Sequence, residues 1–266
     1  SICGVDPSDS TTADLPAPSL LTTLNTPINR PVIGVPRQAH DRHNHPAVIN
    51  ALGDAIDAFV NMGARIVEVD LAHVAHGIAA YYLVACAEAS SNLARFDGVR
   101  YGHRAALTPE DSLLDLYAKS RAEGFGPEVQ RRIMLGTYAL SSGYYDAYYN
   151  TALKVRRRIK QDYDRAFAPN DSMGTPACDA ILMPSSPSPA FKFGEKATDP
   201  LAMYLEDVYT VTVNLAGLPA ITLPGTPTTV DGVSLPVGVQ LIGQAFDESR
   251  LLRIARMLEG AMGSRQ

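Results

Sequence analysis

The segment PVIGVPRQAHDRHNHPAVINALGDAIDAFVNMGARIVEVD, residues 31–70, decides the fold class. It opens with a short apolar run, residues 32–36, which ends in proline and predicts a buried strand. Pro46 suits a first helical turn, and apolar residues then recur at helical spacing until Gly63. Beyond Gly63, apolar residues alternate with Glu68 and Asp70, as in a strand with one wetter face. A strand, a helix and a second strand in succession predict an α/β fold.

The rest of the chain continues this alternation. Further strands are expected at residues 180–183, 220–223 and 237–242, and further helices at about 75–93, from 127, after 143, from 200 and at 251–258. The long helix after Gly143 is expected to bury one stripe, formed by Tyr145, Tyr148, Tyr149, Ala152, Val155, Ile159 and Tyr163. The helix that starts at Pro200 is expected to turn Leu201, Leu205 and Val208 toward the core.

Charge and composition exclude several classes of protein. The 266 residues carry a net charge of -5, which argues against a surface that binds nucleic acid without a partner. The basic cluster at residues 154–160 is interpreted as a solvated helix face. Three widely spaced cysteines without a CxxC pair indicate neither a disulfide framework nor a zinc site. With no apolar run of membrane-spanning length and no signal-peptide pattern, the sequence predicts a cytoplasmic protein with no membrane contact.

Motifs for serine hydrolysis are missing from these residues. The chain has neither Gly-x-Ser-x-Gly nor any Gly-Gly pair, and none of its five lysines lies in a small, apolar sequence setting. The Ser-Ser pairs at residues 90–91, 141–142 and 185–186 are interpreted as helix or turn hydroxyls. The histidines of HDRHNH, residues 40–45, have a spacing that fits no zinc pattern, so a surface loop and no metal site are expected.

Two charged residues have the chemistry to recognise glutamine. A guanidinium answers an α-carboxylate and a carboxylate answers an α-ammonium, the two groups that distinguish glutamine from other amides. Arg132 lies in a segment whose inward positions are otherwise apolar, and Asp207 precedes the turn AGLPA. Periodicity alone leaves either residue as an ordinary surface charge.

Several motifs together carry a resemblance to a known family. AEASSNLARFDGVRYG at residues 87–102 and RRIMLGTYALSSGYYDAYY at 131–149 look like the A subunits of tRNA-dependent amidotransferases, within the amidase signature family. NLAGLPAITLP and LPVGVQLIG are similar to amidases more broadly. The likeness covers nearly the whole chain but only about the C-terminal half of the family's length. It implies a layered α/β/α amidase signature fold with a mixed central sheet, about half of it present, as one partial domain over residues 1–266 without a second domain.

The resemblance also implies where the chemistry lies. The family's Ser-cisSer-Lys triad belongs to its first half, so no catalytic residue is expected in this chain. The start SICGVDPSDSTTAD has no methionine and is similar to a connecting segment, so a truncated or processed fragment is expected. By motif, Arg132 resembles the ligand of the glutamine α-carboxylate, Asp207 that of the α-ammonium, and Tyr81 a tyrosine that lines the pocket.

As a function, the resemblance implies a glutamine-hydrolysing subunit whose ammonia converts Glu-tRNA(Gln), or Asp-tRNA(Asn), in a heterotrimeric complex with subunits B and C. This subunit would need no cofactor, and ATP and magnesium would be used by the partner subunit. Two alternatives stay open: another amidase signature hydrolase that acts on aryl or fatty amides, and a truncated, non-catalytic scaffold module. A pocket for aryl or fatty amides would not need Arg132 and Asp207 together.

Overall fold

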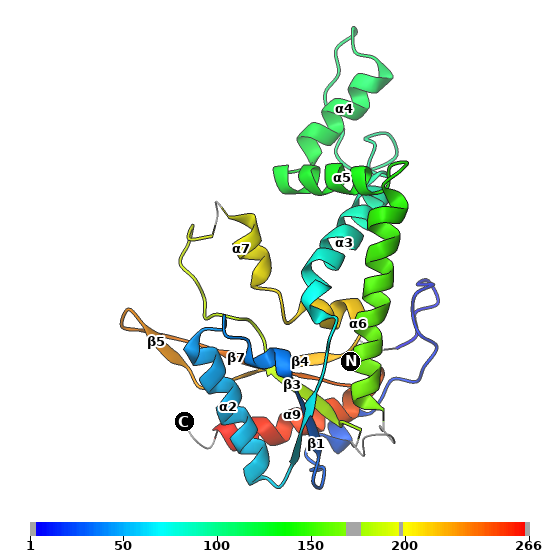
Figure 1. Ribbon diagram of the computed structural model, residues 1–266. Helices are drawn as coiled ribbons and strands as arrows, with labels where there is room; N and C mark the ends of the chain where they lie inside the picture. Colours follow the sequence, from blue (N-terminus) through cyan, green and yellow to red (C-terminus); the bar gives the residue numbers. More distant parts are fainter. Residues whose placement is uncertain (1–3, 169–176, 197–198, 264–266) are drawn as a thin grey trace. The chain divides into compact units, whose positions relative to one another are not determined.

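The computed structural model describes residues 4–168, 177–196 and 199–263. The chain divides into two compact units (Figure 1). Unit 1 comprises Ser1–Ala72 and Lys160–Gln266, and unit 2 comprises His73–Ile159. The expectation of a single partial domain stays a prediction.

Unit 1 contains a mixed five-stranded sheet in the order β2-β1-β3-β7-β4 (Figure 1). Its strands are β1 (Val32–Pro36), β2 (Arg65–Val69), β3 (Ala180–Pro184), β4 (Ala220–Pro224) and β7 (Gly238–Ile242). The first three are parallel, with Ile33 opposite both Ile66 and Ala180, whereas β7 runs antiparallel to β3 and β4. A two-stranded hairpin, β5 (Thr228–Val230) and β6 (Val233–Leu235), is separate from this sheet. The predicted strands and the mixed α/β sheet are confirmed.

The burial of each strand follows its sequence pattern. All five residues of β3 are buried, as the continuous apolar run predicts for a central strand. The edge strand β2 alternates instead, with Glu68 exposed and Val69 buried. The core of unit 1 therefore lies over the middle of the sheet.

The remaining elements of unit 1 are helices. They are α1 (Leu20–Thr23), the 3₁₀ helix η1 (Arg37–His40), α2 (Pro46–Asn61), α7 (Pro200–Leu205), α8 (Val211–Ala216) and α9 (Glu248–Gly263). Helix α2 begins as its sequence predicts, with Pro46 in the first turn and His45 Nδ1 accepting a hydrogen bond from the Ala47 backbone N–H at 3.1 Å. Helices α2 and α9 pack against each other, and both contact β7.

Unit 2 is helical. Its elements are the 3₁₀ helix η2 (Val74–His76), α3 (Gly77–Leu93), α4 (Leu113–Gly124), α5 (Pro127–Ala139) and a π-helix, η3 (Tyr145–Asn150). The boundary between the two units falls inside α6 (Thr151–Phe167). Helices α3 and α5 form the most extensive helix pair of this unit.

The crossing of α3 and α5 depends on Gly136. A Cβ at this position would lie 1.9 Å from the Cys86 carbonyl oxygen and 2.7 Å from the Ser90 Cβ. Only a residue without a side chain allows the two backbones to approach this closely. Beside the crossing, the Ser90 and Thr137 hydroxyls form a hydrogen bond of 2.9 Å.

Gly136→Ala is therefore expected to destabilise the protein by about 1–3 kcal/mol or more, because the added methyl group pushes α3 and α5 apart. The thermal unfolding midpoint and the soluble yield measure this. Gly53→Ala is the matched control, since Gly53 also lies inside a helix but a Cβ there meets nothing within 4 Å. The control should be neutral or stabilising, by up to about 1 kcal/mol. Equal stability of the two variants would mean that the close crossing is wrong.

Two expectations about buried faces are wrong. Tyr145 and Tyr148 are 42% and 40% exposed. They belong to the π-helix, whose wider turn moves them off the stripe that buries Ala152, Ile159 and Tyr163. In α7, Leu201 and Leu205 are also exposed, because apolar spacing in a six-residue helix does not say which side is covered. By contrast, the basic cluster of α6 is exposed as predicted.

Candidate functional site

Tyr81 and Arg132 lie side by side in unit 2. Arg132 is in the first half of α5, and its Nε donates a hydrogen bond to Glu128 Oε1, one turn earlier, at 2.8 Å. Its guanidinium carbon lies 5.7 Å from the centre of the Tyr82 ring, and it is also hydrogen bonded to the Tyr81 side chain. The rings of Tyr81 and Tyr82 meet edge to face at 5.1 Å. The structure therefore brings together two of the three predicted ligands.

The α3–α5 crossing sets this arrangement. Along both helices the contacts follow the same order, first Arg132 with Tyr82, then Gly136 with Cys86, then Thr137 with Ser90. Gly136 follows Arg132 by four residues, which is about one helical turn. The backbone contact at Gly136 therefore fixes the distance at which Arg132 meets the tyrosines of α3.

Arg132 keeps its charge in this environment. The hydrogen bond to the Glu128 carboxylate raises the pKa of Arg132, and the bond to Tyr81 adds to the shift, while partial burial opposes it. The same contacts, from Arg132 and then Arg131, lower the pKa of Glu128. With its side chain 33% exposed, the guanidinium is partly withdrawn from water. A guanidinium has five N–H donors, so the single bond from Nε to Glu128 does not exhaust its capacity for a carboxylate.

Asp207 belongs to unit 1 and lies in the turn between α7 and α8. The sequence pattern predicts a helix at Asp207, whereas α7 ends at Leu205. Its backbone carbonyl accepts hydrogen bonds from the Thr210 and Val211 N–H groups, at 3.1 and 2.9 Å, and so leads into α8. Its side chain is exposed, and among the described residues no hydrogen bond or ion pair of its carboxylate is found. A glutamine site formed by Tyr81, Arg132 and Asp207 together stays a prediction.

Three tyrosines of unit 2 form an exposed cluster. The rings of Tyr138, Tyr144 and Tyr148 have centroids 4.5 to 6.3 Å apart, and each residue is at least 40% exposed. A hydrogen bond with Tyr144 raises the pKa of Tyr138 to about 12. All three belong to a motif that carries the family resemblance, but their exposure could not be inferred from helical spacing.

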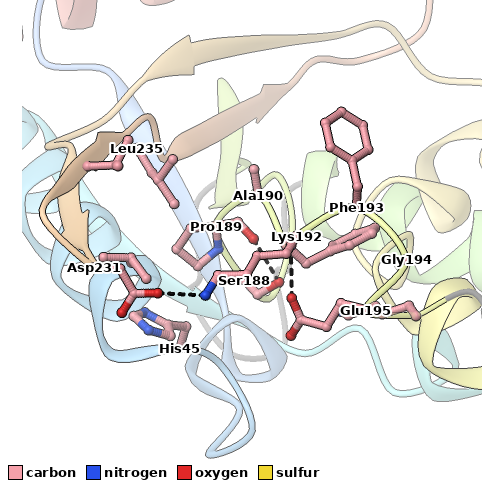
Figure 2. Close-up of a pocket in the computed structure, with 14 residues that line it drawn as sticks. His45, Ser188, Pro189, Ala190, Lys192, Phe193, Gly194, Glu195, Asp231 and Leu235 are labelled. Atoms are coloured by element: carbon pink, nitrogen blue, oxygen red, sulfur yellow. Dashed lines mark hydrogen bonds and ion pairs between the residues drawn. The ribbon is translucent and has the colours of Figure 1, made fainter.

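A large cavity of unit 1 was not predicted from the sequence. It has a volume of about 1020 Å³ and lies between the loop of residues 188–196, the β5–β6 hairpin and His45 (Figure 2). Lys192 Nζ reaches from the loop to Asp231 Oδ2 on the hairpin, at 2.7 Å. None of the three predicted ligands lines this cavity. The dipeptide Asp231-Gly232 between two short β-prone runs is the signal that would have predicted the hairpin.

The histidine-rich loop has a structural role. His43 Nδ1 lies 2.7 Å from Asp41 Oδ1 on the surface, and His45 caps α2. His40, His43 and His45 are all exposed, as predicted for a surface loop. Within the described parts of the chain, no group of three or more His, Cys, Asp and Glu residues could hold a metal ion. No helix in those parts is both long and apolar enough to cross a membrane.

Comparison with known proteins defines the class of protein to which this sheet and these helices belong. The family model described as Amidase matches residues 1–252, so the chain belongs to the amidase family. A bacterial aryl acylamidase of the amidase signature family shares the fold, with a TM-score of 0.71 at 17% identity over 97% of this chain and 49% of that one. The amidase signature fold, with its mixed central sheet, is thus confirmed.

Within the family, the chain is similar to the A subunits of glutamyl-tRNA(Gln) amidotransferases. It is 52% identical over 264 residues to the A chain of that enzyme from Cereibacter sphaeroides, which covers 98% of this chain and 52% of the relative. The identity to the corresponding protein from Carboxydothermus hydrogenoformans is 51% over 258 residues, 97% of this chain and 50% of the relative. The crystal structure of the one from Thermotoga maritima matches with a TM-score of 0.69 and 36% identity, over 96% of this chain and 48% of that one. The chain spans about half the length of these relatives, as predicted.

Proposed function

We propose that this chain is part of the glutamine-hydrolysing A subunit of a tRNA-dependent amidotransferase. The observation that supports this most is the identity of 50–52% to such subunits over nearly the whole chain. The pairing of Arg132 with Tyr81 supports it further, because it offers a charged, partly buried donor group for the α-carboxylate of glutamine.

In this proposal the chain recognises glutamine, and the Ser-cisSer-Lys triad lies in a part of the protein outside these residues. Arg132 binds the α-carboxylate, Asp207 binds the α-ammonium, and Tyr81 holds the guanidinium. The ammonia released converts Glu-tRNA(Gln) to Gln-tRNA(Gln), with Asp-tRNA(Asn) as a second substrate. Subunits B and C are the partners, ATP and magnesium are used by the partner subunit, and the complex is cytoplasmic.

The test compares this chain with the full-length subunit. The chain alone is expected to be poorly soluble and to release no ammonia from glutamine above buffer, because it lacks the Gly-Gly-Ser-Ser turn and exposes sheet edges at β2 and β4. The full-length subunit, assembled with subunits B and C and given ATP, should form Gln-tRNA from glutamine. Ammonia release and aminoacyl-tRNA analysis measure the two reactions.

Two results would refute the proposal. One is glutamine turnover by the chain alone that a point mutation within these residues abolishes. The other is a full-length subunit that hydrolyses aryl or fatty amides at least as well as glutamine and supports no amidation of tRNA. The second result would favour the alternative amidase activity.

A further inference from the structure

Two adjacent carboxylates in the turn between α7 and α8 have different surroundings. The Glu206 carboxylate accepts a hydrogen bond from Ser188 Oγ at 2.7 Å and forms an ion pair with the Lys196 ammonium. The side chains of Lys196 and Glu206 are only 17% and 18% exposed. Asp207, the next residue, is exposed and has no such partner among the described residues. Only one of the two carboxylates is therefore left for a ligand.

The inner side of this turn is anchored to the sheet. Gln240 of β7, which is 2% exposed, donates hydrogen bonds from Nε2 to the carbonyls of Pro184 and Tyr209, at 3.0 and 3.1 Å. The Tyr209 hydroxyl in turn donates to Asn44 Oδ1 at 2.8 Å, and both residues are buried. These bonds fix the end of the turn that leads into α8.

The other end of the turn has a different anchor. α7 is six residues long and exposes Leu201 and Leu205, so packing holds it weakly. The contacts of Glu206 with Ser188 and Lys196 attach this end to the loop of residues 188–196. Lys196 itself lies 4.6 Å from the centre of the Phe191 ring, within the range of a cation–π contact.

We propose that Glu206, held by Lys196 and Ser188, is a positioning residue for Asp207, and this rests on the proposed function. Lys196 neutralises Glu206, so that Glu206 does not compete for the α-ammonium of glutamine. The same contacts hold the backbone next to Asp207, so that its carboxylate meets the ligand without a cost of ordering. Neither Glu206 nor Lys196 touches the substrate in this arrangement.

Lys196→Met in the full-length subunit, assembled with its partner subunits, tests the proposal. The KM for glutamine should rise by about tenfold, because an interaction made equally in the ground and transition states is weakened. The kcat, and the hydrolysis of a simple unsubstituted amide, should stay nearly unchanged. Lys196→Arg keeps the charge and should restore most of the affinity.

Lys192→Met is the matched control. Lys192 is in the same loop and is also ion-paired, but its partner is Asp231 and both side chains are at least 68% exposed. Such exposed pairs contribute about 0–1 kcal/mol, so this variant should bind glutamine normally. If Lys196→Met folds poorly, Glu206→Gln, which keeps an acceptor for Ser188, should show the same selective rise in KM.

An unchanged KM in both Lys196→Met and Glu206→Gln would overturn the positioning role. Equal losses on glutamine and the simple amide would also overturn it, because they indicate a general structural role. Failure of the proposed function gives a distinct result: Asp207→Asn would then leave glutamine use unaffected, whatever Lys196→Met does.

Discussion

Asp207→Asn is expected to weaken glutamine use by about a hundredfold in the full-length subunit with its partners, since charged hydrogen bonds contribute about 1.5–3 kcal/mol. The variant keeps the shape of the side chain but removes the charge that would attract the α-ammonium. Because the described contacts leave this carboxylate exposed and without a partner, its loss should cost the fold little. The measurement is kcat/KM for glutamine in tRNA amidation.

Ammonium supplied directly provides the control for Asp207. It bypasses glutamine hydrolysis, so the variant complex should still amidate Glu-tRNA from ammonium at close to the normal rate. Asp231→Asn is a matched variant, since Asp231 is an exposed aspartate of unit 1 paired with Lys192, and it should leave both reactions unchanged. A collapse of the ammonium-dependent reaction in Asp207→Asn would instead place Asp207 in the fold or in an interface with a partner.

Arg132→Leu is expected to raise the KM for glutamine by about ten- to a hundredfold, the value of one charged hydrogen bond or a bidentate pair. Hydrolysis of a simple unsubstituted amide, which has no α-carboxylate, should stay nearly unchanged. Steady-state ammonia release with both substrates measures the difference. Arg132→Lys should lie between the two, because a lysine keeps the charge but not the planar set of donors.

Arg131→Leu is the matched control for Arg132. Arg131 pairs with the same carboxylate, Glu128, at 2.8 Å, but its side chain is more exposed, at 43% against 33% for Arg132. Its loss should leave the KM for glutamine within about twofold, as expected for a surface ion pair. Equal losses on both substrates in Arg132→Leu would show that Arg132 supports the structure rather than the ligand.

The strands of the sheet could be predicted from the sequence because each leaves a local pattern. β3 and β7 are buried on both faces and so form continuous apolar runs, and β2 alternates. The order of the strands could not be predicted, because the pairing of Ile33 with Ala180 joins residues far apart in the chain. Helix α4 was missed although Ser112 and Asp115 form a capping box, since its apolar residues follow no clear stripe.

The candidate site depended more on resemblance than on pattern. Charge and spacing left Arg132 and Asp207 as ordinary surface residues, and only the family motifs singled them out. No sequence pattern indicates that Lys196 pairs with Glu206, because ten residues separate them and no helical period relates the two. Their contact arises from the path of the loop, which is a tertiary feature.

The close contact of α3 and α5 at Gly136 bears on the thermodynamics of recognition. Main chain, rather than rotatable side chains, separates the helix that carries Arg132 from the one that carries Tyr81. Few rotamers therefore remain to be frozen when a carboxylate arrives, so the entropy of ordering the protein side of this contact is lost during folding rather than during binding. Glutamine binding at Arg132 should accordingly show a small entropic penalty from the protein, and a residue that loosens the crossing should weaken binding without contacting the ligand.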